Sequence, residues 1–500
     1  DQRACFNDEQ IANIAKSATA LAAAQGAPNS PEALATLPQL KTTDLPARPQ
    51  RIPTEFGQIA GTTVLRNDVF TNGVNHLEFD MDLAGLPADL YGWLPRFNEV
   101  IAKMGAAGQD FSRIAERRTS CTGGLWANTN IWNHASDSTK TLRRYRFGLK
   151  TLDSQAENAL ALLGDLIFAV DPRDRNRLRD VMTQVRASYR TTLVNNGSST
   201  AQRQAARGLS PVAALDHLFV SPDALRVIED LSGNFDQHVD ELIRNVERIR
   251  DFIRTHGRWT ISFTGSDAVF RILTRTLEGW QTRLTNAPVE DALPAFHPFT
   301  TLPREGLAGP MLVSHCAKVM PAPHLAHPDV PLLNLGLYLA NFDYMLPEIR
   351  FKGNAYGAGV HYYNTHGVLR LSSFRDPNIV ETLAVFDGLK DHIGAQKWSQ
   401  TDIDRAIIGS AKDVEAPIRP AAATDTALMR HLRGDTYELR EARYAATLRA
   451  TPESVKETTL RVLSANEPRS AICVVSSREK LNKANEQLGD GCLAVSNILE

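Results

Sequence analysis

Apolar side chains recur along this chain with two periods, one typical of β-strands and one typical of α-helices. Between residues 76 and 83 they alternate with polar residues. The polar positions are His76, Glu78, Asp80 and Asp82, and the apolar ones are Leu77, Phe79, Met81 and Leu83. A period of two indicates a half-buried strand in an antiparallel sheet. The preceding Asn72-Gly73 is a favoured two-residue turn and predicts a hairpin with the segment Thr62 to Leu65.

Helical spacing, with apolar residues three and four positions apart, marks several longer segments. The most regular lies at 239–253, with the stripe Leu242, Val246, Ile249 and Ile253. The other predicted helices cover residues 7–24, 90–104, 155–168, 175–189 and 330–344. The last of these is expected to end around Ile349-Arg350.

Two distant stretches share one pattern, a strand followed at once by a helix. Residues 259–264 and 471–475 are the strands, and Ser266 and Ser477 stand where a helix N-cap acceptor is needed. The repetition predicts an α+β fold with two homologous domains, each a mostly antiparallel sheet packed with helices. Chance recurrence of a common strand–helix unit is the alternative.

Composition and charge exclude some classes of partner. The chain has 500 residues, of which 43% are hydrophobic and 22% charged, and 55 basic against 57 acidic residues give a formal net charge of −2. This balance gives no reason to expect a nucleic acid or an anionic membrane as partner. The basic run Arg143-Arg144-Tyr145-Arg146 is therefore interpreted as a solvated face. No apolar run approaches the ~20 residues that span a bilayer.

The cysteines and histidines suggest neither a disulfide framework nor a metal site. Five scattered cysteines without C-x-x-C spacing favour free thiols over disulfides. Neither H-E-x-x-H nor H-x-x-E-H occurs. His324 and His327 lie near Asp329, but prolines interrupt the segment, so a solvated loop is preferred to a zinc site. We expect no metal ligands on this chain.

One segment carries a more specific pattern. Residues 350–357, Arg-Phe-Lys-Gly-Asn-Ala-Tyr-Gly, resemble the R-x-K-G-G-A-Y-G signature in the C-terminal half of presequence proteases, a branch of the pitrilysin/insulinase zinc metallopeptidases. Residues 373–378, Ser-Phe-Arg-Asp-Pro-Asn, resemble the S-Y-R-D-P-N strand end of that family. Residues 30–46, 401–404 and 413–417 resemble further family elements in the same order. The resemblance therefore spans almost the whole chain.

The resemblance implies a four-domain clamshell in which two halves are joined by a helical hairpin. Zn²⁺ is bound by an inverted H-x-x-E-H motif in the N-terminal half, so an N-terminal zinc-bearing half, covalent or separate, is the expected partner. This chain is expected to begin within the second hairpin helix. The expected organisation is residues 1–52 as hairpin end and linker arm, 53–287 as a first non-catalytic domain, 288–310 as a connector and 311–500 as a second domain with the signature.

The resemblance also assigns roles within the signature. Arg350 and Tyr356 correspond to residues that reach the scissile peptide, where donors stabilise the negative charge that grows on the carbonyl oxygen. The positions expected to contact substrate are Lys352, Gly353, Asn354 and Gly357. Asn354 replaces the second Gly of the signature, and Asn tolerates a positive φ better than most residues. The alternative is purely structural, with Arg350 at a helix C-terminus and Tyr356 in a strand interface.

Three functions remain open on the sequence. The first is the C-terminal half of a zinc metalloendopeptidase that degrades short unstructured peptides, inactive without its zinc-bearing half. The second is a non-catalytic subunit that completes a separate zinc-bearing chain. The third is a structural or binding homologue that keeps only the fold. Retention of both Arg350 and Tyr356 favours the first two, and nothing in the sequence indicates a compartment.

Overall fold

The chain forms two compact units, Asp1–Leu45 and Pro46–Glu500. The computed structural model describes residues 6–27, 29–38, 40–255, 258–281, 283, 290, 292–414, 416–489 and 491–499. The predicted connector 288–310 is therefore described only in part, and its Pro288 lies outside the described residues, as do Pro28 of the arm and Cys5. Across the described part of the chain, no helix combines the length and apolarity needed to cross a membrane.

The smaller unit is mainly one helix. The helix predicted at 7–24 is present as α1 (Asp8–Gly26), followed by α2 (Pro31–Ala35) and a single 3₁₀ turn, η2 (Thr42–Asp44). Asn7 caps α1, because its Oδ1 accepts from the Gln10 amide at 2.8 Å and the Gln10 side chain accepts from the Asn7 amide at 3.0 Å. Ser30 caps α2 in the same way, with its Oγ 3.2 Å from the Ala33 amide.

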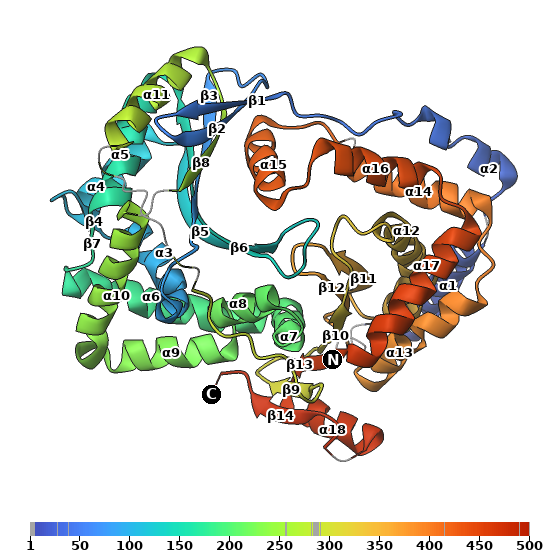
Figure 1. Ribbon diagram of the computed structural model, residues 1–500. Coiled ribbons are helices and arrows are strands. Elements are labelled where there is room, and N and C mark those ends of the chain that lie inside the picture. The colour runs from blue at the N-terminus through green and yellow to red at the C-terminus, as the bar shows by residue number, and fades with distance from the viewer. Residues whose placement is uncertain are drawn as a thin grey trace. The chain divides into compact units, whose positions relative to one another are not determined.

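A first six-stranded sheet opens the larger unit, in the order β1-β2-β8-β3-β6-β5 (Figure 1). Its strands are β1 (Thr54–Ile59), β2 (Thr62–Asn67), β3 (Val74–Asp82), β5 (Gly124–Asn133), β6 (Thr141–Leu152) and β8 (Trp259–Thr264). Only β2 and β8 run parallel, and the other neighbours are antiparallel. The strand predicted here is present as β3, and Leu77, Phe79 and Met81 lie in the core. The expectation that it is half-buried is wrong, because Glu78 and Asp80 on its polar face are buried as well.

The predicted hairpin between residues 62–65 and β3 is wrong. Asn72 and Gly73 do form the turn, with φ of 50° and 78°, but β8 lies between β2 and β3 and pairs with both. The hairpin partner of β2 is β1, through Ala60 and Gly61, which also have positive φ. The turn was a local signal, whereas the insertion of β8 depends on a segment that is distant in the sequence.

Helices cover the first sheet and extend from it. The stripe predicted at 239–253 is confirmed within α10, since all four residues are buried. The helices are η3 (Ala88–Trp93), α3 (Leu94–Lys103), α4 (Phe111–Cys121), η4 (Asp153–Gln155), α5 (Ala156–Ala169), α6 (Arg175–Asn195), α7 (Gly197–Ala206), α8 (Pro211–Phe219), α9 (Pro222–Gly233), α10 (Phe235–Thr255) and α11 (Asp267–Gln281). Two short strands, β4 (Gly105–Ala106) and β7 (Val170–Asp171), pair separately.

The second sheet repeats the topology of the first. Its order is β11-β12-β10-β13-β9-β14, with strands β9 (Arg304–Ala308), β10 (His315–Pro321), β11 (Gly357–Tyr363), β12 (Val368–Phe374), β13 (Ala471–Ser476) and β14 (Ala494–Asn497). Strands β9, β13, β10, β12 and β11 match β2, β8, β3, β6 and β5 in order and direction. The sheets differ in the edge strand, which is antiparallel β1 in one and parallel β14 in the other. The duplication is therefore one of topology and not only of a strand–helix unit.

The second domain has its own helical layer. Ser477 caps the helix after β13 as predicted, with its Oγ 3.3 Å from the Lys480 amide. The helices are α12 (Val330–Ala340), the π-helical segment η5 (Asn341–Lys352), α13 (Val380–Ala395), α14 (Gln400–Val414), α15 (Pro420–Arg433), α16 (Tyr437–Leu448), α17 (Pro452–Asn466), the short η6 (Glu467–Arg469) and α18 (Arg478–Leu488).

Each domain lends one helix to the sheet of the other. Helix α15 of the second domain packs on β2, β3 and β8, and α7 of the first packs on β10, β12 and β13 (Figure 1). Gly197 opens α7 where a Cβ would lie 2.4 Å from the ring of His315, so only glycine allows this approach. The exchange ties both domains into one unit.

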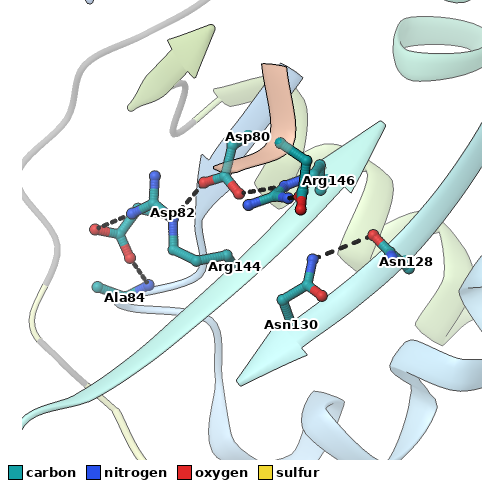
Figure 2. A network of polar contacts seen from close by, with 8 residues as sticks. Asp80, Asp82, Ala84, Asn128, Asn130, Arg144 and Arg146 are labelled. Atoms are coloured by element: carbon teal, nitrogen blue, oxygen red, sulfur yellow. Dashed lines mark hydrogen bonds and ion pairs between the residues drawn. The ribbon is translucent and has the colours of Figure 1, made fainter. Parts of the chain in front are cut away.

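The basic run at 143–146 is buried, so its interpretation as a solvated face is wrong. Arg144 and Arg146 both donate to Asp80, which has no exposed surface (Figure 2). Arg146 also reaches Asp425 of α15 at 2.5 Å. The polar face of β3 is thus covered by a helix from the other domain instead of by water.

Candidate functional site

The signature, residues 350–357, lies at the end of an unusual helix. Helix α12 continues without a break into η5, which contains Pro347 and ends at Lys352, slightly beyond the predicted end at Ile349-Arg350. The Gly353 amide bonds the carbonyl of Glu348, five residues back, at 3.0 Å. Such π-helical geometry is rare and is found often at functional sites. Its wider turns let the helix continue past the proline.

Arg350 projects from the last turn of η5 and is exposed. Its guanidinium carbon lies 5.8 Å from the ring centroid of the adjacent Phe351. Among the residues that the structure describes, its guanidinium has no hydrogen-bond or ion-pair partner. Lys352 is different, since its Nζ bonds Glu348 at 2.6 Å. Of these two cations, Arg350 is therefore the one whose charge has no ion-pair partner among the described residues.

A tight turn follows η5. A Cβ on Gly353 would lie 2.6 Å from the carbonyl oxygen of Ile349, so the turn requires glycine there. Asn354 has a φ of 62°, the left-handed conformation that Asn adopts more readily than most residues. The positive φ expected from its replacement of glycine is thus observed. Gly357 then begins β11, and open space surrounds its Cβ position.

The second motif of the sequence, residues 373–378, holds this turn in place. The Asn378 Nδ2 donates to the Gly353 carbonyl at 2.7 Å, and the Tyr356 amide donates to the Arg375 carbonyl at 3.2 Å. Asp376 fixes the second motif internally. Its buried carboxylate accepts hydrogen bonds from the Asn378 amide at 2.9 Å and from Thr382 Oγ1 at 2.7 Å. The two motifs are separate in sequence but form one rigid structure.

Tyr356 stands on this structure with its side chain 66% exposed. The ring meets Phe374 edge-on, with centroids 5.8 Å apart and an interplanar angle of 75°. The Arg375 guanidinium carbon is 5.9 Å from the ring centroid. The phenol hydroxyl has no hydrogen-bond partner within the described part of the chain. The ring therefore does not fill a strand interface, and Tyr356 and Arg350 both present unused donors.

A cavity of 730 Å³ is lined by η5 and β11, the elements that flank the signature, and we call it the α12–β11 cavity. Its walls come from α12, η5, β11, α14, α15 and α16, with Leu335, Tyr338, Phe342, Leu346 and Ile407 among its apolar members. Asn341 lies in the same wall and bonds the main chain of β11, donating to the Val360 carbonyl at 2.9 Å and accepting from its amide at 2.7 Å. Nothing in the sequence indicated this cavity or this contact.

The residues that the structure describes do not fit the zinc ion that the family implies. Within the described ranges, no group of three or more His, Cys, Asp or Glu side chains is placed to hold a metal. At the candidate loop, the Asp329 carboxylate accepts two bonds from Arg461, at 2.6 and 2.8 Å, and His327 Nδ1 lies 3.6 Å from it. That carboxylate is therefore already neutralised.

The architecture of two similar α+β domains is shared with solved structures. It is similar to the "peptidase M16 inactive domain" from Pseudomonas fluorescens, with a TM-score of 0.60 and 13% identity over 89% of this chain and 99% of that one. It is also similar to a protease from Helicobacter pylori, with a TM-score of 0.58 and 13% identity over 85% of this chain and 100% of that one. These likenesses show the fold.

Sequence comparison gives the family. The model of the domain associated with M16 peptidases of subfamily C matches residues 2–231, and the one described as "PreP C-terminal domain" matches residues 330–477. Presequence protease 1 of Arabidopsis thaliana is 24% identical over 97% of this chain and 45% of its own length, and Protein HypA of Clostridium perfringens is 22% identical over 97% and 49%. The chain thus spans about half the length of these relatives. It belongs to the presequence protease branch of the M16, or pitrilysin-type, peptidases and corresponds to their C-terminal half.

Proposed function

We propose that this chain is the C-terminal half of a zinc metalloendopeptidase that degrades short unstructured peptides, and that Arg350 and Tyr356 stabilise charge on the scissile carbonyl oxygen. The zinc ligands are expected on the N-terminal half, which we infer to be its partner. The names of the relatives support a peptidase role. The domain limits 1–52, 53–287, 288–310 and 311–500 belong to the same proposal.

One observation carries the assignment of the two residues. Arg350 and Tyr356 are exposed on either side of the turn that Asn378 and Asp376 hold, and neither side chain donates a hydrogen bond to another described residue. A guanidinium stays charged at any working pH and a phenol donates one hydrogen bond. Donors already fixed in position stabilise developing charge without reorganisation, which is how such groups accelerate acyl transfer. Gly353 and Asn354 would let a peptide approach the turn, and Lys352 and Gly357 border it.

The test is kinetic and uses this chain assembled with its zinc-bearing half. Arg350→Ala and Tyr356→Phe are each expected to lower kcat by about 10²–10³-fold while KM changes much less. Arg405→Ala is the matched control, because that arginine is 65% exposed on α14 and pairs with Asp402 of its own helix. Unchanged turnover in both signature variants would leave this chain the role of a structural or binding homologue.

A second measurement addresses the division between the halves. The isolated chain is expected to contain no stoichiometric zinc and to leave a fluorogenic peptide intact. Metal analysis and a peptidase assay on the purified chain check this. Robust cleavage by this chain alone would contradict the proposal.

A further inference from the structure

The α12–β11 cavity has a wall that is basic as well as apolar. Four cationic residues, Lys412, Arg430, Arg440 and Arg443, line it together with a single carboxylate, Asp435. Its volume of 730 Å³ falls within the range of roughly 300–1,000 Å³ that is usual for small-ligand pockets. A chain with a net charge of −2 has therefore gathered an excess of positive charge around one concave apolar surface.

Some of this positive charge is not neutralised by the protein. Asp435 is bonded to Arg443 at 2.8 Å, but the other terminal nitrogen of Arg443, Nη1, is buried without a hydrogen-bond partner among the described residues. The Arg430 side chain likewise has no hydrogen bond or ion pair within the described part of the chain. Burial, and then repulsion from Arg440, lowers the pKa of Arg430 to about 10, so it remains charged near neutral pH. A buried donor left unpaired is costly, and an anion would remove that cost.

The cavity also shares its elements with the signature. Segment η5 lines it with Phe342 and Leu346 and ends just past Arg350, and β11 lines it with Ala358 and Tyr362 and follows directly on Tyr356. At about 3.3 Å per residue, the six positions from Tyr356 to Tyr362 span roughly 20 Å. A peptide whose scissile bond meets Arg350 and Tyr356 would thus reach the cavity within about six extended residues.

Strand pairing does not provide the recognition at this point. Strand β11 is the edge of its sheet, but Asn341 already occupies both main-chain groups of Val360. A peptide here must instead be bound through side-chain contacts and charge. An arginine fork matches a carboxylate in two parallel bonds, which makes it selective for that group.

We propose that the α12–β11 cavity binds the C-terminal residue of a peptide, with Arg430 and Arg443 holding the free α-carboxylate and Leu335, Tyr338 and Ile407 contacting an apolar side chain. This assignment takes the peptide-binding role of the proposed function as its premise. It adds a preference for substrates that end a few residues beyond the cleaved bond.

The experiment measures peptide binding to the intact chain by calorimetry, without the zinc-bearing half. The probes are a hexapeptide that ends in Phe with a free carboxylate, the same peptide amidated, and an amidated peptide with an internal Asp. We expect the free acid to bind at least about tenfold more tightly than either amidated peptide, the effect of losing one charged hydrogen bond. Equal affinity of the amidated peptide, or of the internal-Asp peptide, would overturn the assignment of the α-carboxylate.

Variants place the binding in the cavity. Arg430→Gln is expected to weaken binding of the free acid by roughly 10- to 100-fold, the size of a lost charged hydrogen bond. Arg419→Gln, at the exposed other end of α15, should leave it unchanged. Thr447→Glu puts a carboxylate into the cavity wall and should abolish binding even if Arg430→Gln fails to fold. Undiminished binding in Thr447→Glu would sink the proposal.

The outcome is separable from that of the kinetic test. No cleavage is measured here, so a failure to bind would leave the roles of Arg350 and Tyr356 untouched. Conversely, unchanged turnover in the signature variants would not remove a carboxylate-dependent binding signal from the isolated chain.

Discussion

The two domains share a topology but use their polar residues in opposite ways. In the first, the polar face of the sheet is closed by α15, and Asp80 lies fully buried between Arg144 and Arg146. In the second, Arg350 at the end of η5 and Tyr356 just before β11 are exposed, on either side of a turn whose main chain is held by Asn378. In the first domain charge stabilises the packing of two domains. In the second, the fold stabilises the backbone and leaves the side chains free.

Burial and pairing therefore separate structural from functional polar residues in this duplicated fold. Removing a buried charge that is paired with other residues of the same protein lowers stability, because its partner is left buried and unpaired. Removing an exposed hydrogen-bond donor that has no partner within the protein costs little stability, and such a donor is available to a ligand. Substitutions on each side of this contrast should therefore differ in their effect on unfolding.

The largest effect is expected at Asp80. Asp80→Ala leaves two buried arginines without their common partner, which costs about 3–5 kcal/mol for a broken buried ion pair. Asp425→Ala removes the partner of Arg146 that is 53% exposed and should cost about 1 kcal/mol or less. Denaturant unfolding of both variants checks this. Equal losses would show that Asp80 contributes no more than a surface pair.

Glu78 should make the stability of the first domain depend on pH. Burial raises the pKa of this carboxyl from 4.5 to about 8, against the opposing influence of Arg146. The folded state then holds a proton that the unfolded state releases, so stability falls as pH rises from about 4.5 to about 8. Glu78→Gln should flatten this part of the profile. Melting temperatures measured across the window check it, and parallel profiles would contradict it.

An intermediate effect is expected at the signature turn. Asn354→Val forces a β-branched residue into a left-handed conformation and should cost about 1–2 kcal/mol. Asn354→Gly keeps the conformation accessible and should be close to neutral. Thermal unfolding of the pair isolates the backbone contribution from that of the side chain. A similar loss in both variants would point to a role of the Asn side chain instead.

The smallest effect is expected at the exposed donors. Arg350→Ala and Tyr356→Phe should each change the free energy of unfolding by no more than about 0.5 kcal/mol, as for other surface positions. The same unfolding measurement checks this on the variants used for kinetics. A large loss of stability would place these residues with Asp80, on the structural side of the comparison.

Local signals in the sequence predicted much of the fold. The alternation in β3, the stripe of α10 and the cap at Ser477 were all readable, because each depends on residues within a few positions. The left-handed Asn354 belongs to the same class. Contacts between distant segments were not readable. The insertion of β8 beside β3 and the burial of Arg144 are of this kind.

In the candidate site, too, local motifs could be predicted from the sequence, whereas contacts between distant segments could not. The motif around Arg350 and Tyr356 was recognisable from its own residues, and so was the motif at 373–378. That Asn378 of the second holds Gly353 of the first could only come from the structure. The α12–β11 cavity is formed by several helices and a strand together, so no local sequence pattern could predict it. Part of the resemblance at 413–417 falls on residue 415, outside the described residues.

Because η5 is wound as a π-helix, the direction of the Arg350 side chain depends on the number of residues in that segment. In an α-helix each residue turns the side-chain direction by about 100°, and wider turns advance it by less. The direction in which the Arg350 side chain projects is therefore set by how many residues separate it from Asn341. Asn341 itself is held in place by two hydrogen bonds to the main chain of Val360. Loss or gain of a single residue in that interval would change the direction in which the Arg350 guanidinium projects, without altering the side chain itself. Insertions and deletions, more than substitutions, are the changes to which this segment is most sensitive.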